Sequence, residues 1–195
     1  MPWKFFDKFG VRQRELFPIE QFADLPRSTS VPTTIVDGQE VLLVDFLTTP
    51  NWHWRLRYNA FSTATYKWEY IGGIPAIAFE GASFSTSSVT DVQDLVSSPP
   101  AFQINHPGIY RVEFGAKLQN GSTGSFGTIT LYNGGVSTSV TLNGNGQGVM
   151  QGSVITNVIG SFGGVVEMRF KSNNASFSQT FSQRWIQLTP IAINQ

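Results

Sequence analysis

The feature that most constrains this chain is an alternation of apolar and polar side chains in short segments. In residues 110–118, Tyr110, Val112 and Phe114 alternate with Arg111 and Glu113. Side chains two residues apart lie on the same face of a β-strand, so this segment has one apolar and one charged face. Further apolar or alternating segments lie at 128–132, 136–142, 150–158, 165–171 and 184–193, separated by Gly- and Asn-rich turns. Short strands at spacings of about 8–12 residues predict an all-β sandwich or barrel for residues 75–195.

An earlier stretch, residues 33–74, predicts a smaller antiparallel sheet. Apolar side chains alternate with polar ones on two segments: Trp52, Trp54, Leu56 and Tyr58 on the first, and Tyr66, Trp68 and Tyr70 on the second. We expect residues 59–65 to join these strands as a hairpin loop. The opposite face would bring Arg55 and Arg57 near Lys67 and Glu69, where opposite charges can pair across strands. Such a small sheet is marginal alone and needs a neighbour.

Residues 1–32 combine aromatic and charged side chains without a regular period. Aromatic side chains at this density need either the protein's own core or the surface of a partner. Two interpretations stay open: an arm folded back on the same chain, or an anchor that docks on another subunit. If the arm is an anchor, the attachment residues are Trp3, Phe5, Phe6 and Phe9.

The charge balance bears on the partners. Thirteen basic and thirteen acidic residues give a net charge of zero, which argues against electrostatic attraction to nucleic acid or to an anionic membrane. Charged residues make up 13% of the chain, compared with about a quarter in ordinary soluble proteins. From Leu118 onward only Glu167, Arg169, Lys171 and Arg184 are charged, which favours a homo-oligomer. The chain has no cysteine, and no apolar run is long enough for a signal peptide or a membrane span.

Residues that carry out chemistry are scarce. The only histidines are His53, on a strand, and His106, before a proline, and no hydrolase, P-loop or zinc motif is present. Asp91 and Asp94 lie close in sequence, but two carboxylates are too few for a calcium site without further ligands. We therefore expect no catalytic residues, no metal and no cofactor.

Trp52 and Trp54 allow two interpretations. If exposed, the two rings would form a platform for stacking a glycan; if buried, they belong to the core of the small sheet. The core interpretation is favoured because Leu56 shares their face, and an aliphatic side chain there suits packing.

Several segments resemble known viral proteins. Residues 107–116, Pro-Gly-Ile-Tyr-Arg-Val-Glu-Phe-Gly-Ala, resemble the Gly-x-Tyr-x-Val-x-Phe strand of trimeric jelly rolls related to tumour necrosis factor and complement globular heads. Similar strands occur in C-terminal domains of bacteriophage virion proteins, and residues 181–191 resemble the closing strand of those domains. The opening residues 1–7 and residues 37–41, 54–60 and 66–73 resemble phage tail and minor structural proteins.

The resemblance implies a small N-terminal antiparallel sheet (33–74) followed by a trimeric C-terminal jelly roll (75–195), with the arm at 1–32. It implies a virion structural protein, assembled in the host cytoplasm, whose partners are its own copies and a major capsid or tail protein. The first interpretation is a capsid decoration or head-fibre protein; the alternative is a tail-tip or fibre protein that recognises a host surface glycan. A depolymerase is disfavoured, since the family supplies no catalytic motif. The chain lacks collagen-like and heptad repeats, which favours a compact projection over a long fibre.

Overall fold

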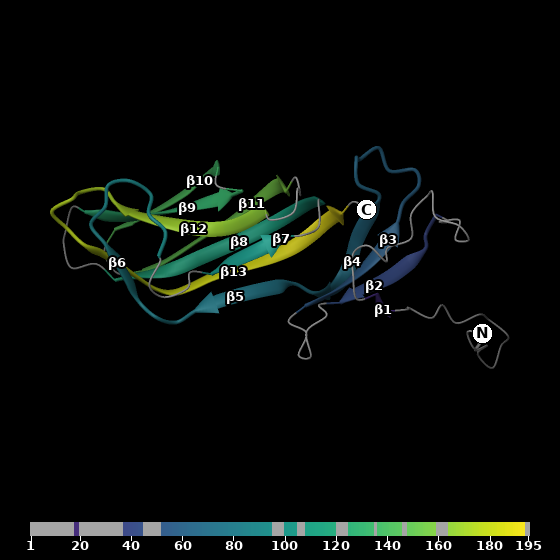
Figure 1. Cartoon of the computed structure of the whole chain (residues 1–195), viewed down its shortest axis with the longest axis horizontal. Helices are drawn as coiled ribbons and strands as arrows, with labels where there is room; N and C mark the ends of the chain where they lie inside the picture. The colour runs from purple at the N-terminus through teal and green to yellow at the C-terminus, as the bar shows by residue number, and fades with distance from the viewer. Residues whose placement is uncertain are drawn as a thin grey trace.

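The computed structural model describes residues 18–19, 37–44, 52–94, 100–104, 108–119, 125–134, 136–145, 148–158 and 164–193. Within these residues the chain forms thirteen strands and no helix (Figure 1). The long sheet has the order β1 (Pro18–Ile19), β2 (Glu40–Val44), β3 (His53–Tyr58), β4 (Trp68–Ile74), β13 (Gln179–Ile193), β8 (Gly108–Gln119) and β11 (Gly148–Val158), and β5 (Ala76–Glu80) and β6 (Phe84–Thr86) also pair with β13. The short sheet has the order β10 (Val136–Asn145), β9 (Phe126–Asn133), β12 (Gly164–Ser172) and β7 (Ala101–Ile104).

The strand order of the sandwich is that of a jelly roll. One layer contains β5 and β6, then β13, β8 and β11, and the other contains β7, β12, β9 and β10. Except for the β9–β10 hairpin, each strand from β7 to β13 crosses to the opposite layer from the strand before it. This pattern is two interlocked Greek keys. The expected all-β fold, with a small N-terminal sheet and a jelly-roll sandwich, is confirmed. Among the described strands only β1 pairs in parallel, with β2.

β13 joins the small sheet to the sandwich. One edge of β13 pairs with β8 from Thr180 to Ile193. Its other edge pairs in turn with β6, β5 and β4, the last through Ala192 and Ile193. The boundary expected between residues 74 and 75 falls between β4 and β5, and β13 pairs with the strands on both sides of it. Figure 1 shows β13 running from the sandwich towards β2, β3 and β4.

The core lies between the two layers and continues beneath the small sheet. The apolar residues that alternate with polar ones along β8 and β12 are buried: Tyr110, Val112, Phe114, Val166, Met168 and Phe170 are all 0% exposed. In the small sheet Trp54, Leu56 and Trp68 are at most 2% exposed. Alternation in these strands therefore identified the buried face correctly, because side chains two residues apart share a face.

The outward face of β12 is covered by another part of the chain. Glu167 alternates with the apolar Val166 and Met168, which would place it in solvent, but it is only 6% exposed. Residues 88–94 extend the edge of the short sheet beside β12, with Val92 and Phe170 exchanging two backbone hydrogen bonds of 2.9 Å. Gln93 Nε2 then donates to the Glu167 carboxylate at 2.8 Å. A segment without apolar alternation thus covers a face that appeared free in the sequence.

Substitution of Phe170 tests whether the core is packed as described. Its ring packs on Phe84 and Phe181, with centroids 5.6 and 4.8 Å away. Phe170→Ala should lower the free energy of unfolding by about 3–5 kcal/mol, since it removes buried area and leaves a cavity. Phe177→Ala, at a position 41% exposed, is the matched control and should change it by about 0.5 kcal/mol or less. Urea unfolding followed by fluorescence measures both, and equal effects would contradict this core.

Candidate interaction surface

The outer face is formed by side chains of β5, β13, β8 and β11 that point away from the short sheet. Strand pairing places Phe79, Trp185, Gly115 and Gln151 in one row across the four strands. The next row is Ile77, Gln187, Glu113 and Ser153. The alternation of buried and exposed positions along these strands gives this face its own set of side chains.

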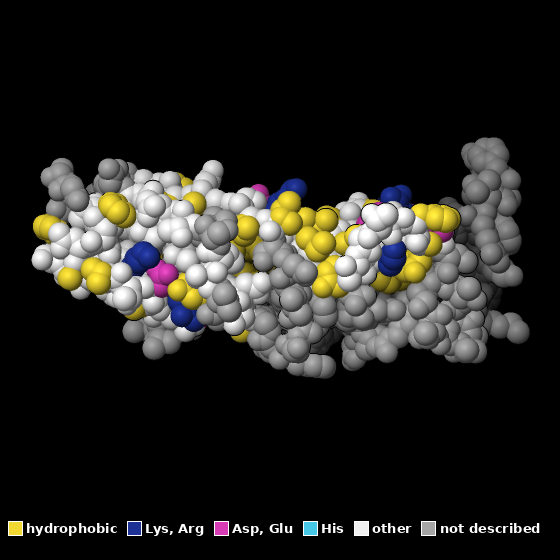
Figure 2. Space-filling model, turned by 90° about the horizontal axis from the view of Figure 1, so that it is seen from above, with side chains coloured by type: hydrophobic (Ala, Val, Ile, Leu, Met, Phe, Trp, Pro, Cys, Tyr) yellow, Lys and Arg dark blue, Asp and Glu magenta, His cyan; other side chains and the backbone are white. Residues whose placement is uncertain are grey.

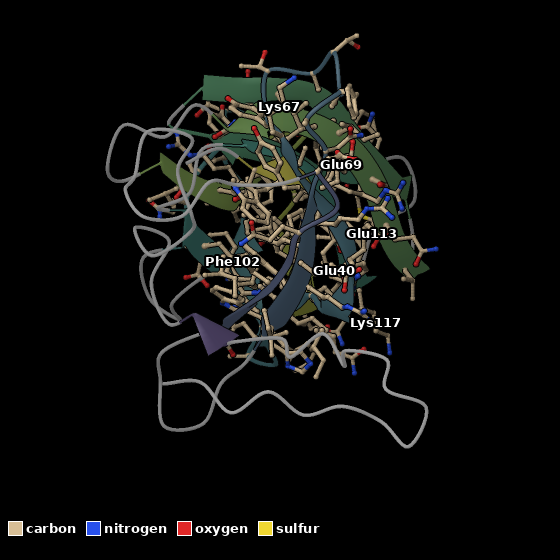
Figure 3. The ribbon with its side chains drawn as sticks, turned by 90° about the vertical axis from the view of Figure 1, so that its right-hand side faces the viewer. Glu40, Lys67, Glu69, Phe102, Glu113 and Lys117 are labelled. Carbon is tan, nitrogen blue, oxygen red and sulfur yellow. The ribbon has the colours of Figure 1, made fainter. Side chains whose placement is uncertain are left out.

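Apolar side chains gather at the two rims of the outer face. Ile77 and Phe79 on β5 are 53% and 65% exposed, and Val149 and Ile155 on β11 are 71% and 60% exposed. The centre is polar: β8 carries Arg111, Glu113 and Lys117, and Gln187 Nε2 donates to Glu113 at 3.0 Å. Seen along the long axis, Glu113 and Lys117 lie on the opposite side of the molecule from Phe102 of the short sheet (Figure 3).

Trp185 depends on a glycine in the neighbouring strand. A Cβ placed on Gly115 would lie 2.4 Å from the carbonyl oxygen of Met150 and 3.0 Å from Trp185 Nε1. No larger residue fits there, so the indole packs close to the β8 backbone and remains half-buried. Trp185 thereby forms a fixed apolar surface beside Phe79.

On one side of the sandwich, two long strands have no further described strand paired to their outer edges. β10 ends the short sheet, β11 ends the long sheet, and neither contains a Lys, Arg, Asp or Glu. Natural edge strands are usually protected by charges, prolines or covering segments. Beside these strands an edge pocket of about 370 Å³ is lined by Leu118, Phe126, Val149 and Met150, with Asn143 and two glycines, Gly144 and Gly148. On the face drawn in Figure 2, charged side chains are sparse over the sandwich.

A polar network occupies the outward face of the short sheet. The Asp91 carboxylate accepts hydrogen bonds from Tyr132 Oη at 2.9 Å and Thr130 Oγ1 at 3.2 Å, and Lys171 Nζ lies 3.3 Å away. The Arg169 guanidinium lies 4.0 Å from the centre of the Tyr132 ring. Desolvation, followed by the hydrogen bond to Asp91, raises the pKa of Tyr132, so its hydroxyl stays protonated and donates. These contacts give Asp91 a structural role, and the described residues contain no cluster of three or more potential metal ligands.

Asp94 and Arg184 form a fully buried ion pair. Their nearest oxygen and nitrogen are 2.5 Å apart, and both side chains are 0% exposed. Arg184 Nη2 also donates to the carbonyl of Ala82 at 3.0 Å. A register shift between Ser182 and Trp185, with a φ of 47° at Gln183, accompanies the inward placement of Arg184. No local pattern in the sequence indicates this pair, because the two residues are 90 positions apart.

The residues expected to bind partners are only partly described. Trp54 is 2% exposed and stacks on Trp52, with ring centroids 4.1 Å apart. Only Trp52 keeps accessible ring surface, so a glycan contact at this place would use Trp52. The expected anchor residues Trp3, Phe5, Phe6 and Phe9 lie outside the described residues, as does His106.

The charged face of the small sheet agrees with the expected cross-strand pairing. Arg57 lies 4.0 Å from Glu69 on the neighbouring strand. Arg55 instead pairs with Glu40 on β2, at 2.7 Å. The β5 rim was not foreseen, because residues 76–79, Ala-Ile-Ala-Phe, are apolar at every position and show no alternation.

No family model matches this chain, and no curated protein matches it. Among solved structures, the chain is similar to a chain in the structure of the infectious bursal disease virus Gx strain, with a TM-score of 0.39 and 11% identity, covering 70% of this chain and 38% of that chain. It is similar to murine APRIL, with a TM-score of 0.33 and 12% identity, covering 55% of this chain and 97% of that chain. It is also similar to the VP2 subviral particle of infectious bursal disease virus, with a TM-score of 0.32 and 9% identity, covering 72% of this chain and 44% of that chain.

The chain spans less than half the length of the two viral chains. At these TM-scores the jelly-roll assignment rests on the chain's own strand order. The described residues include no helix long and apolar enough to cross a membrane.

The buried ion pair generates a stability prediction. Asp94→Asn leaves the buried guanidinium of Arg184 without its carboxylate, so the free energy of unfolding should fall by about 3–5 kcal/mol. The control is Glu40→Gln, which breaks the exposed pair with Arg55 and should cost about 1 kcal/mol or less. Chemical denaturation measures both, and a loss at Asp94 no larger than that at Glu40 would show that the pair contributes nothing.

Proposed function

We propose that this chain is a bacteriophage virion structural protein, and that it acts as a capsid decoration or head-fibre protein. The arm at residues 1–32 attaches it to the shell, with Trp3, Phe5, Phe6 and Phe9 as the contact residues. The sandwich projects outward as a trimer. The protein acts by binding alone, without catalysis, and its partners are its own copies and a major capsid protein.

The observation that carries this proposal is the pair of apolar rims on the outer face. Four large side chains at its rims, Ile77, Phe79, Val149 and Ile155, are each more than half exposed, and the adjacent edges of β10 and β11 carry no charge. A monomer that works alone in water rarely leaves such a surface uncovered. A zero net charge also removes the repulsion that keeps free proteins apart. Both properties suit a subunit of an assembly.

The position of the arm supports attachment at one end. β1 pairs with β2 at the outer edge of the small sheet, away from the sandwich (Figure 1). The arm therefore joins the described structure at the end opposite the connection between β12 and β13. An aromatic side chain buries about 150–250 Å², and apolar burial contributes about 25 cal/mol per Å². A few aromatics from each of three arms therefore offer enough apolar area to hold the trimer on a shell.

The alternative function is a tail-tip or fibre protein that binds a host glycan. The observation that favours it is the half-buried Trp52, whose ring rests on Trp54 and keeps accessible surface. The decoration role is preferred because it also accounts for the aromatic arm at residues 1–32, which would attach the protein to the shell.

Removal of the arm tests attachment. A chain lacking residues 1–22 should remain a soluble trimer but should no longer bind particles that lack this protein, since the aromatic contacts are gone. A variant with serine at Trp3, Phe5, Phe6 and Phe9 keeps β1 and should behave in the same way. Phe61→Ser, at an exposed position outside the arm, is the control and should bind normally. Cosedimentation with particles measures occupancy, and normal occupancy of the serine variant would refute the anchor.

The trimer is tested by the mass of the free protein. Native mass spectrometry of the whole chain should give three times the 21.5 kDa of one chain, because the outer face is covered only on association. A stable monomer at micromolar concentration would contradict the proposed assembly.

A further inference from the structure

We propose that each copy inserts the β5 ridge, formed by Ile77 and Phe79, into the edge pocket of the next copy. The inference rests on the proposed trimer and names the two surfaces that would build it. The occupant of the edge pocket is thus a second copy of this chain.

The β5 ridge has the properties of an inserting element. Ile77 and Phe79 project from a strand that pairs only with β13 among the described strands. Trp185, in the same row as Phe79, packs against Gly115, so a rigid surface flanks the ridge. Rigid aromatic side chains lose little conformational entropy on binding, which makes them effective anchors.

The edge pocket has the complementary properties. Buried Leu118 and Met150 line it together with the exposed Val149 and Phe126. Gly144 and Gly148 contribute no side chains, and a Cβ on Gly148 would meet no atom within 4 Å. The flanking strands β10 and β11 carry no charge, so an apolar side chain entering here would desolvate no ionised group of these strands. The pocket thus suits an aromatic or branched apolar side chain.

The relative position of ridge and pocket points to a closed ring of copies. They lie at opposite edges of one sheet, so a copy joined through them makes a head-to-tail contact, which forms either a ring or an open filament. Phe79 shares its row with Gln151 on β11, and Met150 and Val149 are one and two residues away on that strand. At about 3.4 Å per residue, the row of Phe79 and the position of Val149 differ by about 7 Å along the strand direction. A rotation about an axis inclined to the strands would join ridge and pocket, and the inclination would offset this difference so that the ring closes.

A second copy explains more than an unrelated partner would. Each molecule carries one ridge and one pocket, so a ring covers both on every subunit with a single kind of contact. It also shields the uncharged β10 and β11 edges, which otherwise invite pairing with other chains. An unrelated protein seated in the pocket would leave the β5 ridge exposed.

The absence of cysteine from the natural chain allows a direct test by cross-linking. The double variant Phe79→Cys/Val149→Cys is treated with a short bis-maleimide and run on a denaturing gel. A ring contact joins the ridge of each copy to the pocket of the next, so the expected product is a covalent trimer with no larger species. Each single variant should stay a monomer on the same gel, because ridge does not meet ridge and pocket does not meet pocket.

The matched control is Phe61→Cys/Val149→Cys. Phe61 is 84% exposed in the hairpin loop after β3, outside the β5 ridge, and this pair should give no covalent trimer. A trimer by native mass without cross-linking of the Phe79/Val149 pair would overturn the ridge-and-pocket contact while leaving the proposed function intact. Cross-linking of Phe79→Cys alone would overturn it as well, in favour of a two-fold contact, and a ladder beyond three chains would show an open filament.

A substitution without any cross-linker gives an independent readout. Phe79→Asp places a charge at the apolar contact, so native mass should shift from trimer to monomer, while Phe61→Asp should leave the trimer unchanged. Phe79 is exposed within one chain, so circular dichroism should show the same β-structure for both variants. A trimer that survives Phe79→Asp would overturn the proposal.

Discussion

The backbone hydrogen bonds on both edges of β13 are the interaction on which the rest of the structure depends. Along one edge β13 pairs with β8 almost throughout its length, and along the other it pairs with three separate strands. Because buried backbone groups must be paired, β4, β5 and β6 are held in one sheet although they are separate strands. The small sheet and the sandwich therefore share a strand, and the position of one relative to the other follows from β13.

The register of β13 also determines what lies inside and outside. The shift after Ser182 accompanies the placement of Arg184 between the layers, where it meets Asp94. Beyond that shift Trp185 and Gln187 face outward, while Ile186 and Leu188 are buried. Without it the side chains that follow would exchange faces, since a shift of one residue inverts a strand. One irregularity is thus linked to both the buried ion pair and the apolar outer face.

The outward faces of the two sheets differ in how far the protein's own chain covers them. The outward side of the short sheet is filled by its own chain, through Asp91, Gln93 and their partners on β9 and β12. The outer face of the long sheet has no such cover among the described residues, and its rims are apolar. This asymmetry between the two layers is the reason for proposing that copies associate through the long sheet.

The sequence by itself determined the strands whose two faces differ in polarity. In β3, β8 and β12 the alternation identified the core residues, and the jelly-roll resemblance of residues 107–116 agrees with the place of β8 in the sandwich. It also indicated the pairing of Arg57 with Glu69, because a hairpin brings near neighbours in sequence together.

Only the tertiary structure decided the rest. β5 is apolar on both faces, so its sequence could not show which side chains would stay exposed. Asp94 and Arg184 meet across 90 residues, and residues 88–94 cover β12 through hydrogen bonds that leave no periodic trace. The outer face and the edge pocket exist because strands distant in sequence lie side by side, and such contacts depend on how the layers pack rather than on any local pattern.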